Sequence, residues 1–397
     1  MFEYFPGNYA WSTSVNLALM AGGTIGDIHR WLAPLRDSRS TDVYEWGAAW
    51  SAMGHQQERL AEIDVRDGHR TTAGTRLLRA SVYHATGQRQ IPPGPVKSES
   101  YAAMLQAFGD AVEHTPLPVE RIHVDSPDGM LPGYLIAPPT RREPGRRSPV
   151  VIVFGGLDMT KELLYAIIGR TFAERGITCL VIDTPGVGEP LRIRGVPSRP
   201  DYEVPAAAII DDLETREGID ASRVAVMGLS LGGYYAARAA AYEKRISACV
   251  AWSGIWDFGT TWRRRWETGA AYHVPWFQLP WALGEPTMEG ALERVRQWSL
   301  VDVWPEVTQS LLIVHGEDDQ QIPVADAARA FEAAGSADKE LRVFTASDGG
   351  AQHIQTDDPD PARQLIADWL AQRLVVAPPA RPRTLDATAD RVASLQP

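Results

Sequence analysis

Cysteine is almost absent from this sequence of 397 residues. The two that occur, Cys179 and Cys249, each lie in an apolar run typical of a buried strand. Thiols at such positions predict buried side chains rather than a framework of disulfides. We therefore expect a reducing compartment and a cytoplasmic location.

The sequence also lacks a long apolar run and an excess of basic residues. The most apolar early stretch, residues 15–21, is far too short to span a bilayer, and residues 1–10 contain no Lys or Arg of the kind that opens a secretory signal. The net charge is −11, and no basic stripe is present that would bind a phosphate backbone. We expect neither a membrane nor a nucleic acid as partner.

Motifs for metals and nucleotides are missing as well. Gly186-x-Gly188 is not followed by the third glycine of a dinucleotide-binding turn. No cluster of His, Cys and Asp has the spacing of metal ligands, so we expect no metal and no cofactor. The histidines of the first 115 residues are interpreted as surface or packing residues: His29, His55, His69, His84 and His114.

What the sequence does contain is a serine in a glycine-rich turn. Residues 228–233 read Gly-Leu-Ser-Leu-Gly-Gly, preceded by the strand-like run 223–227 and followed by the alanine-rich, helix-favouring stretch 234–242. This order is the nucleophile elbow of the α/β-hydrolase fold, and it predicts that Ser230 is the nucleophile. A side chain at Gly228 or Gly232 should collide with the neighbouring strand or helix.

The pattern of the remaining chain predicts two domains and a tail. Residues 1–117 have helical spacing of apolar residues and predict a helical cap domain. Residues 118–375 predict the catalytic domain, which opens with a hairpin of alternating faces at 119–124 and 131–137. Later apolar strands alternate with helices, which indicates a mostly parallel sheet covered on both sides. Residues 376–397 read as a loose tail.

Two later residues are candidates to complete a catalytic triad. A serine hydroxyl needs a base, and the base needs a carboxylate that orients it. Asp319 follows the predicted strand 311–315 in Gly-Glu-Asp-Asp, with Asp318 as the alternative, and His353 lies in a polar loop after the last predicted strand. The oxyanion hole is predicted from the backbone of Leu231 together with that of Gly156 and Leu157.

A tryptophan-rich insertion, about residues 255–305, holds seven of the 13 tryptophans. Such rings could line a pocket for a flat or apolar substrate, or they could only pack the insertion against the helical domain. Residues 263–265, three consecutive arginines, are interpreted as a solvated face, although one of them could pair with an acidic or phenolate group on a ligand. The predicted substrate-binding residues of this segment are Trp256, Asp257, Trp262, Trp266 and Glu267.

Several of these segments together resemble one group of α/β-hydrolases with an N-terminal helical cap. The group includes 2,6-dihydroxypseudooxynicotine hydrolase and the fungal heptaketide-shortening hydrolases of melanin synthesis. The resemblance rests on residues 228–257, on residues 155–162 (Gly-Gly-Leu-Asp-Met-Thr-Lys-Glu), on the turn 316–319, and on His353 with the helix that contains residues 367–370. It covers about residues 119–375 well and the cap more weakly.

The resemblance implies the triad Ser230, Asp319 and His353, and cleavage of a carbon–carbon bond beside a ketone in a polyketide-like or aromatic small molecule. It also implies an acidic substrate-recognition residue after residue 252, for which Asp257 and Glu267 are both open. The alternatives are an ester-directed enzyme, either a carboxylesterase or an acetate-eliminating tailoring enzyme, and, from a different class, a non-catalytic binding protein. The oligomeric state is left open between a monomer and a homodimer, because the cap could either cover the site alone or pair with another subunit.

Overall fold

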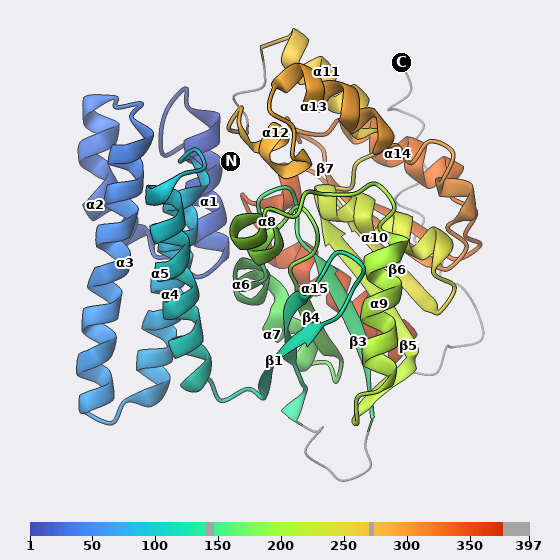
Figure 1. Ribbon diagram of the computed structural model, residues 1–397, viewed down its shortest axis with the longest axis horizontal. Coiled ribbons are helices and arrows are strands. Elements are labelled where there is room, and N and C mark those ends of the chain that lie inside the picture. The colour runs from blue at the N-terminus through green and yellow to red at the C-terminus, as the bar shows by residue number, and fades with distance from the viewer. Residues whose placement is uncertain (140–146, 270–273, 376–397) are drawn as a thin grey trace.

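The computed structural model describes residues 1–139, 147–269 and 274–375. Its first part is a set of helices that we call the cap, seen at the left of Figure 1. Asp42 begins α3 by accepting hydrogen bonds from the backbone N–H groups of Tyr44 and Glu45, and Pro95 occupies the first turn of α5, where its missing N–H costs nothing. The cap helices are α1 (Tyr9–Met20), α2 (Ile25–Ser38), α3 (Val43–Arg66), α4 (Arg70–Arg89) and α5 (Pro95–Glu113).

The second part is a sheet of eight strands in the order β1-β2-β4-β3-β5-β6-β7-β8. β1 and β2 form an antiparallel hairpin, β2 is antiparallel to β4, and every later pairing is parallel. This confirms the predicted α/β-hydrolase fold. The strands are β1 (Val119–Val124), β2 (Leu131–Ile136), β3 (Ser148–Phe154), β4 (Thr178–Ile182), β5 (Ile219–Leu229), β6 (Ile246–Trp252), β7 (Ser310–Gly316) and β8 (Lys339–Phe344).

Helices cover both faces of this sheet. Along β3, Val151 and Val153 belong to one apolar cluster, whereas Val150, Ile152 and Phe154 belong to another, so alternate side chains point into two separate cores. The covering elements are α6 (Lys161–Leu164), η2 (Tyr165–Gly169), α7 (Arg170–Ala173), α8 (Gly188–Arg194), α9 (Glu203–Glu214), α10 (Leu231–Tyr242), α14 (Val324–Ala333), η6 (His353–Gln355) and α15 (Asp360–Leu374).

The cap shares one of these two cores. Trp11, Trp46 and Trp50 of the cap lie in the same apolar cluster as Val151 and Val153, so the cap and the sheet are packed as one body. The predicted alternation of the hairpin is wrong for β2, all of whose residues are buried, because β2 lies between β1 and β4 with apolar clusters on both sides.

The predicted insertion folds as short helices above β6 and β7. They are α11 (Phe258–Glu267), α12 (Gln278–Leu283), α13 (Met288–Arg294), η4 (Val295–Gln297) and η5 (Trp304–Glu306). Cys179 and Cys249 are buried and unpaired, as expected. The predicted tail, residues 376–397, lies outside the described residues.

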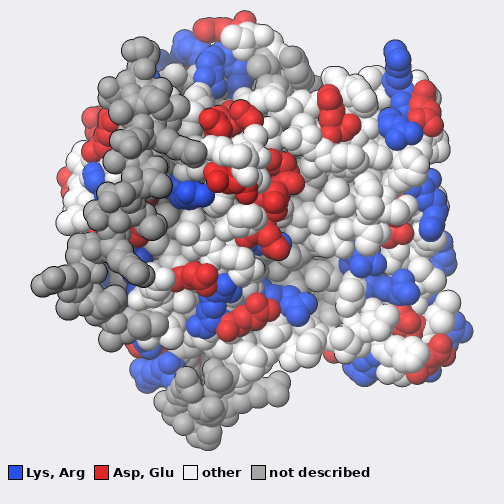
Figure 2. Space-filling view, turned by 180° about the vertical axis from the view of Figure 1, so that it is seen from behind, with Lys and Arg blue, Asp and Glu red and all other residues white. Residues whose placement is uncertain are grey.

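Two properties of the surface bear on partners. Within the described residues, no helix is both long and apolar enough to cross a membrane. On the face shown in Figure 2, acidic and basic side chains are intermingled over the atoms that are not grey.

Candidate active site

Ser230 lies at the sharp turn between β5 and α10, in a backbone conformation that side chains rarely adopt (φ 58°, ψ −120°). Its N–H donates to the carbonyl oxygen of Trp252 at 2.8 Å, and its own carbonyl oxygen accepts from Gly233 N–H at 2.8 Å. These two bonds hold the strained turn against β6 and start the helix. Strain of this kind, held in place by surrounding contacts, is typical of a functional residue.

The glycines around Ser230 are required by close backbone contacts. A Cβ at Gly228 would lie 1.8 Å from the carbonyl oxygen of Gly232, at the start of α10. A Cβ at Gly232 would lie 2.3 Å from the carbonyl oxygen of Phe154 at the end of β3. The predicted collisions with helix and strand are therefore confirmed.

Asp319 lies in the loop after β7 and is buried, whereas Asp318 is exposed. Its Oδ1 accepts backbone N–H bonds from Gln321 at 2.8 Å and Ile322 at 2.9 Å, and its Oδ2 lies 2.7 Å from His353 Nδ1. Burial alone would raise the pKa of Asp319, but His353, His315 and these backbone donors outweigh it and hold the pKa below its usual value. Asp319 is therefore an ionised acceptor.

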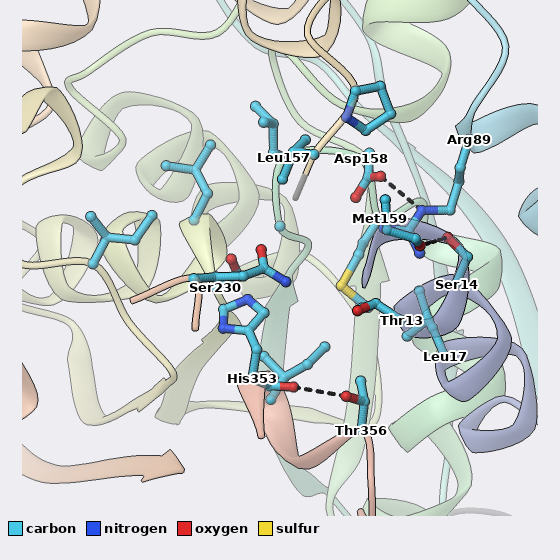
Figure 3. A pocket seen from close by; sticks show the side chains of 18 of the residues that line it. Thr13, Ser14, Leu17, Arg89, Leu157, Asp158, Met159, Ser230, His353 and Thr356 are labelled. Atoms are coloured by element: carbon cyan, nitrogen blue, oxygen red, sulfur yellow. Dashed lines mark hydrogen bonds and ion pairs between the residues drawn. The ribbon is translucent and has the colours of Figure 1, made fainter. Parts of the chain in front are cut away.

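His353 is oriented by that carboxylate. Because an ionised carboxylate can only accept, Nδ1 must carry the ring proton, and Nε2 is left as a hydrogen-bond acceptor. The ring of His353 and Ser230 line the same pocket, and Figure 3 shows the ring next to Ser230. An imidazole of this tautomer beside a serine is arranged to accept the hydroxyl proton.

The loop that carries His353 is fixed by residues that the sequence analysis missed. The carboxylate of Asp357 accepts the N–H groups of Ala351 and Gln352, each at 3.0 Å. Ser253 Oγ accepts the N–H of Ile354 at 3.0 Å. An acidic residue four positions after a candidate histidine was the available sequence signal.

The three residues predicted to form the oxyanion hole all line the pocket: Leu231 at the start of α10, and Gly156 and Leu157 in the loop after β3. Leu231 is the first residue of α10, so its N–H has no acceptor within the helix. A Cβ at Gly156 would lie 3.1 Å from the carbonyl oxygen of Leu229 and 3.3 Å from Ser230 Cβ. The loop after β3 therefore packs closely against the elbow, as two converging donors require.

A buried ion cluster lies beneath this loop. Lys161 Nζ lies 2.6 Å from Glu162, 2.9 Å from Asp183 and 2.7 Å from Glu189, and Asp183 also accepts the backbone N–H of Lys161 at 2.8 Å. Burial by itself would lower the pKa of Lys161, but the carboxylates outweigh it and raise that pKa well above its usual value. The ammonium group of Lys161 is thus a buried cation, and its ion pairs hold the end of the loop after β3 in place.

The cap supplies one wall of the pocket, which the sequence analysis did not predict. Ala10, Thr13, Ser14 and Leu17 of α1 line the pocket, together with Arg89 at the end of α4 and Gln90 directly after it. Figure 3 shows Thr13, Leu17 and Arg89 across the pocket from Ser230. Arg89 Nε donates to Asp158 Oδ2 at 2.7 Å, and both side chains are largely buried. Asp158 directly follows Leu157, so this ion pair joins the cap to the predicted oxyanion loop (Figure 3).

The predicted substrate-binding residues of the insertion do not line this pocket. Trp262 is fully buried in the core, Trp256 packs against the same core, and Trp266 and Glu267 are exposed. Asp257 is the N-cap of α11: its Oδ1 accepts Thr260 N–H at 2.6 Å, and its Oδ2 accepts the Ser299 hydroxyl at 2.9 Å. These contacts correct the prediction, since a capping carboxylate is occupied by the protein itself.

Other residues of the insertion reach the pocket instead, namely Ile255, Phe258, Arg265, Val274 and Pro275. Of the tryptophans, Trp298 and Trp304 are buried in the core, as is Trp262. Trp281 lies under Lys97 of the cap, with the ammonium nitrogen 5.1 Å from the ring centroid. None of these tryptophans lines the pocket, and of the contacts described only that of Trp281 joins the insertion to the cap. The buried ones pack within the catalytic domain, and Trp266 and Trp276 are exposed.

The structure also brings together one His–Glu–His group in the cap that the sequence analysis did not recognise. Glu58 accepts from His55 at 2.7 Å and from His84 at 2.9 Å, and the ligand atoms of the three lie within 4.8 Å of one another. His55 and Glu58 are three residues apart on α3, which was the available signal, but His84 comes from α4. The carboxylate bridges the two rings by hydrogen bonds.

Comparison with known proteins places the chain among hydrolases. Residues 34–257 match the sequence model of the esterase FrsA-like family, and residues 170–374 match that of the prolyl oligopeptidase family. The α/β-hydrolase ucsC of an Acremonium species is 31% identical over 305 residues, which cover 70% of this chain and 60% of ucsC. The hydrolase ORFZ of Pyricularia oryzae is 32% identical over 312 residues, which cover 74% of this chain and 70% of ORFZ. The chain thus matches less than two thirds of the length of ucsC.

Solved structures share the architecture. The 2,6-dihydroxy-pseudo-oxynicotine hydrolase superposes with a TM-score of 0.78 at 26% identity, covering 93% of this chain and 98% of that one. AbyA5 superposes with a TM-score of 0.61 at 20% identity, covering 88% and 98% respectively, which shows a shared fold. Both superpositions cover a larger share of this chain than the catalytic domain alone occupies, so both include cap residues.

Proposed function

We propose that this chain, a hydrolase that belongs to the FrsA-like esterase family, uses Ser230, His353 and Asp319 to cleave a carbon–carbon bond beside a ketone. The substrate would be a polyketide-like or aromatic small molecule. The observation that carries this proposal is the Asp319–His353 hydrogen bond of 2.7 Å, which leaves His353 Nε2 as an acceptor in the pocket of the strained Ser230.

Each residue has a distinct task in this reaction. His353 Nε2 removes the proton of Ser230 as Oγ bonds to the ketone carbon, and the backbone N–H groups of Leu231 and Leu157 stabilise the oxyanion. The carbon–carbon bond then breaks, and its electron pair remains on the departing carbon as an enolate. His353 returns its proton to that carbon. Water, deprotonated by the same histidine, releases the acyl group as an acid and restores Ser230.

The choice of a carbon–carbon bond is supported by similarity rather than by geometry. The superposition on 2,6-dihydroxy-pseudo-oxynicotine hydrolase covers 93% of this chain, cap included, and the sequence resemblance to the same group extends through both predicted catalytic loops. An ester-directed enzyme is the second candidate, because the matched family is described as esterase-like. The same serine, histidine and oxyanion hole would serve an ester or the elimination of acetate.

Products formed in water enriched in ¹⁸O separate these candidates. The protein is incubated with benzoylacetone, a 1,3-diketone, and with a series of acetate esters, and the products are identified by mass. Benzoylacetone should give a ketone and an acid that carries one ¹⁸O. Turnover of esters without turnover of the diketone would replace the first candidate with the second, and an alkene with unlabelled acetate would identify elimination.

The nucleophile is tested separately with a fluorophosphonate probe. Ser230→Ala should abolish covalent labelling and all turnover. Ser14→Ala is the matched control, because Ser14 lines the same pocket but bonds to Ala10 and Gln90. Labelling that persists in Ser230→Ala, or that disappears in Ser14→Ala, would contradict the assignment.

A further inference from the structure

Arg265 is a buried cation in the pocket of Ser230 and His353. The residue is 6% exposed, whereas its neighbours Arg263 and Arg264 are exposed. It projects from α11 two turns after Phe258, another residue of the pocket lining, so both lie on the inward face of that helix. A guanidinium group on the buried face of a helix calls for a partner.

The partners that the protein supplies are incomplete. Nη2 of Arg265 donates to the carbonyl oxygen of Gln321 at 2.7 Å, and the guanidinium carbon lies 5.4 Å from the ring centroid of Trp262. Its Nε is buried and has no hydrogen-bond partner among the described residues. Neither contact neutralises the charge, since one is to a neutral oxygen and the other to an aromatic face.

The other charged groups at the pocket already have hydrogen-bond partners. Arg89, the other arginine of the lining, is paired with Asp158 at 2.7 Å. Asp319, which interacts electrostatically with Arg265, is bonded to His353 and to two backbone N–H groups. Burial lowers the pKa of Arg265 to about 10, so the side chain remains positively charged at neutral pH. Asp319 therefore acts on Arg265 only at a distance, and no carboxylate among the described residues accepts a hydrogen bond from the Arg265 guanidinium group.

The position of Arg265 links this charge to the departing half of the substrate. Gln321, whose carbonyl oxygen binds Arg265, donates its own N–H to Asp319 Oδ1. Arg265 is therefore attached to the loop that orients His353. In the proposed reaction, His353 gives its proton to the leaving carbon, so the leaving half must lie on this side of the pocket.

We propose that Arg265 binds an anionic oxygen on the leaving half of the substrate, either a carboxylate or the enolate oxygen of a 1,3-dicarbonyl group. This inference rests on the proposed function and names its substrate class. When the carbon–carbon bond of a 1,3-diketone breaks, the electron pair is delocalised onto the second carbonyl oxygen, to which the guanidinium group of Arg265 can donate. The proton that His353 took from Ser230 then goes to the carbon, so charge and atoms balance.

Matched substrates test where the negative charge is recognised. 4-Acetoxybenzoate carries a carboxylate on its leaving half, its methyl ester is neutral, and phenyl hemisuccinate carries the carboxylate on its acyl half; benzoylacetone supplies the enolate. We expect Arg265→Met to lower kcat/KM about 10- to 100-fold for 4-acetoxybenzoate, for benzoylacetone or for both, because a hydrogen bond to a charged group is lost. The neutral ester and phenyl hemisuccinate should change less than threefold.

Variants of neighbouring residues make the result specific. Arg264→Met removes an exposed arginine one residue away and should leave all four substrates unaffected. Arg265→Lys should recover part of the loss, since it keeps the charge but not the forked donors. An equal loss for charged and neutral substrates, or no loss at all, would overturn the proposal, and a loss for phenyl hemisuccinate alone would overturn the placement on the leaving half.

A binding measurement keeps this inference separate from the proposed catalysis. Benzoate is titrated into Ser230→Ala and into Ser230→Ala/Arg265→Met, and the affinity is measured by calorimetry. We expect at least a tenfold weaker affinity in the double variant. If Ser230→Ala still turns over the esters, the proposed nucleophile fails, whereas equal benzoate affinity in the two variants refutes the anion site.

Discussion

Replacing Asp319 with Asn tests the proposed triad with almost no change of shape. The two carboxylate oxygens have different partners: Oδ1 accepts the N–H groups of Gln321 and Ile322, and Oδ2 accepts Nδ1–H of His353. Asparagine has only one oxygen. If that oxygen keeps the two backbone bonds, the NH₂ group faces His353, and Nδ1 must become an acceptor. The ring proton then moves to Nε2, the atom that has to take the proton of Ser230.

The expected loss of kcat follows from the free-energy cost of turning the asparagine amide the other way round. Turning the oxygen toward His353 would place an NH₂ group against two buried backbone donors, at about 1–3 kcal/mol for each lost bond. The wrong histidine tautomer is thus favoured by about 2–6 kcal/mol, or about 30-fold to 10⁴-fold. We expect kcat to fall about 10³- to 10⁴-fold, in line with the typical effect of this substitution in a serine triad.

The assay compares kcat for 4-nitrophenyl acetate with the rate of fluorophosphonate labelling, and both should fall together. The melting temperature should change by only a few degrees, because the backbone bonds to the side-chain oxygen survive. Asp318→Asn is the matched control, since that side chain is exposed. A kcat for Asp319→Asn above about a tenth of the original, or an equal loss in Asp318→Asn, would refute the reasoning.

Three further predictions concern stability and can be checked by urea denaturation. Gly228→Ala places a Cβ 1.8 Å from a carbonyl oxygen of α10 and should cost more than about 3 kcal/mol, whereas Gly109→Ala, in an open helical position, should stabilise by about 0.5–1 kcal/mol; equal effects would contradict the contact argument. Asp257→Ala removes the N-cap of α11 and should cost about 1 kcal/mol with kcat/KM nearly unchanged, and a large loss of kcat/KM would restore its predicted role in substrate binding. Arg89→Met leaves Asp158 buried without its partner and should cost about 3 kcal/mol at pH 7. Burial opposes ionisation, but Arg89 outweighs it and lowers the pKa of Asp158 in the folded state, so the pair stabilises above about pH 4 and its contribution is lost as the pH falls through the lowered pKa. The difference between Arg89→Met and the original chain should therefore shrink in acid, and a difference independent of pH would refute this assignment.

The sequence allowed the fold to be predicted where the signals are local. Strands such as residues 150–154 are apolar on both faces, and the elbow around Ser230 combines a strand, a glycine turn and a helix within residues 223–242. The start of α3 is also a local signal, because Asp42 caps the helix through its own side chain. The alternation assigned to β2 was wrong, since the burial of its outer face depends on residues of the cap, far away along the chain.

Of the candidate site, only the proposed triad could be predicted from the sequence. Asp319 and His353 could be named because the fold prescribes their order after the serine. In the structure, Asp319 Oδ2 lies 2.7 Å from His353 Nδ1. The substrate-facing residues could not, because an aromatic residue in α11 has the same local pattern whether it faces a core or a pocket. Trp262 and Arg265 lie one turn apart on this helix, yet the first is in the core and the second lines the pocket. The sequence signal that distinguishes Arg265 from Trp262 is its charge, because a charged residue on the inward face of a helix is unusual in a core.

The cap differs from a passive cover in how it is attached. Its polar link to the catalytic domain at the pocket, Arg89 to Asp158, ends one residue after Leu157, whose N–H is a proposed oxyanion donor. On the other side of Leu157, Gly156 leaves little room for a side chain, because a Cβ there would lie 3.3 Å from Ser230 Cβ. The short loop therefore lies directly beside the nucleophile. We therefore expect a displacement of the cap to reach the proposed oxyanion donors. A cap that only enclosed the substrate would affect KM, whereas a cap bonded to the oxyanion loop affects kcat, because a donor that is displaced in the transition state lowers the rate without weakening the ground state.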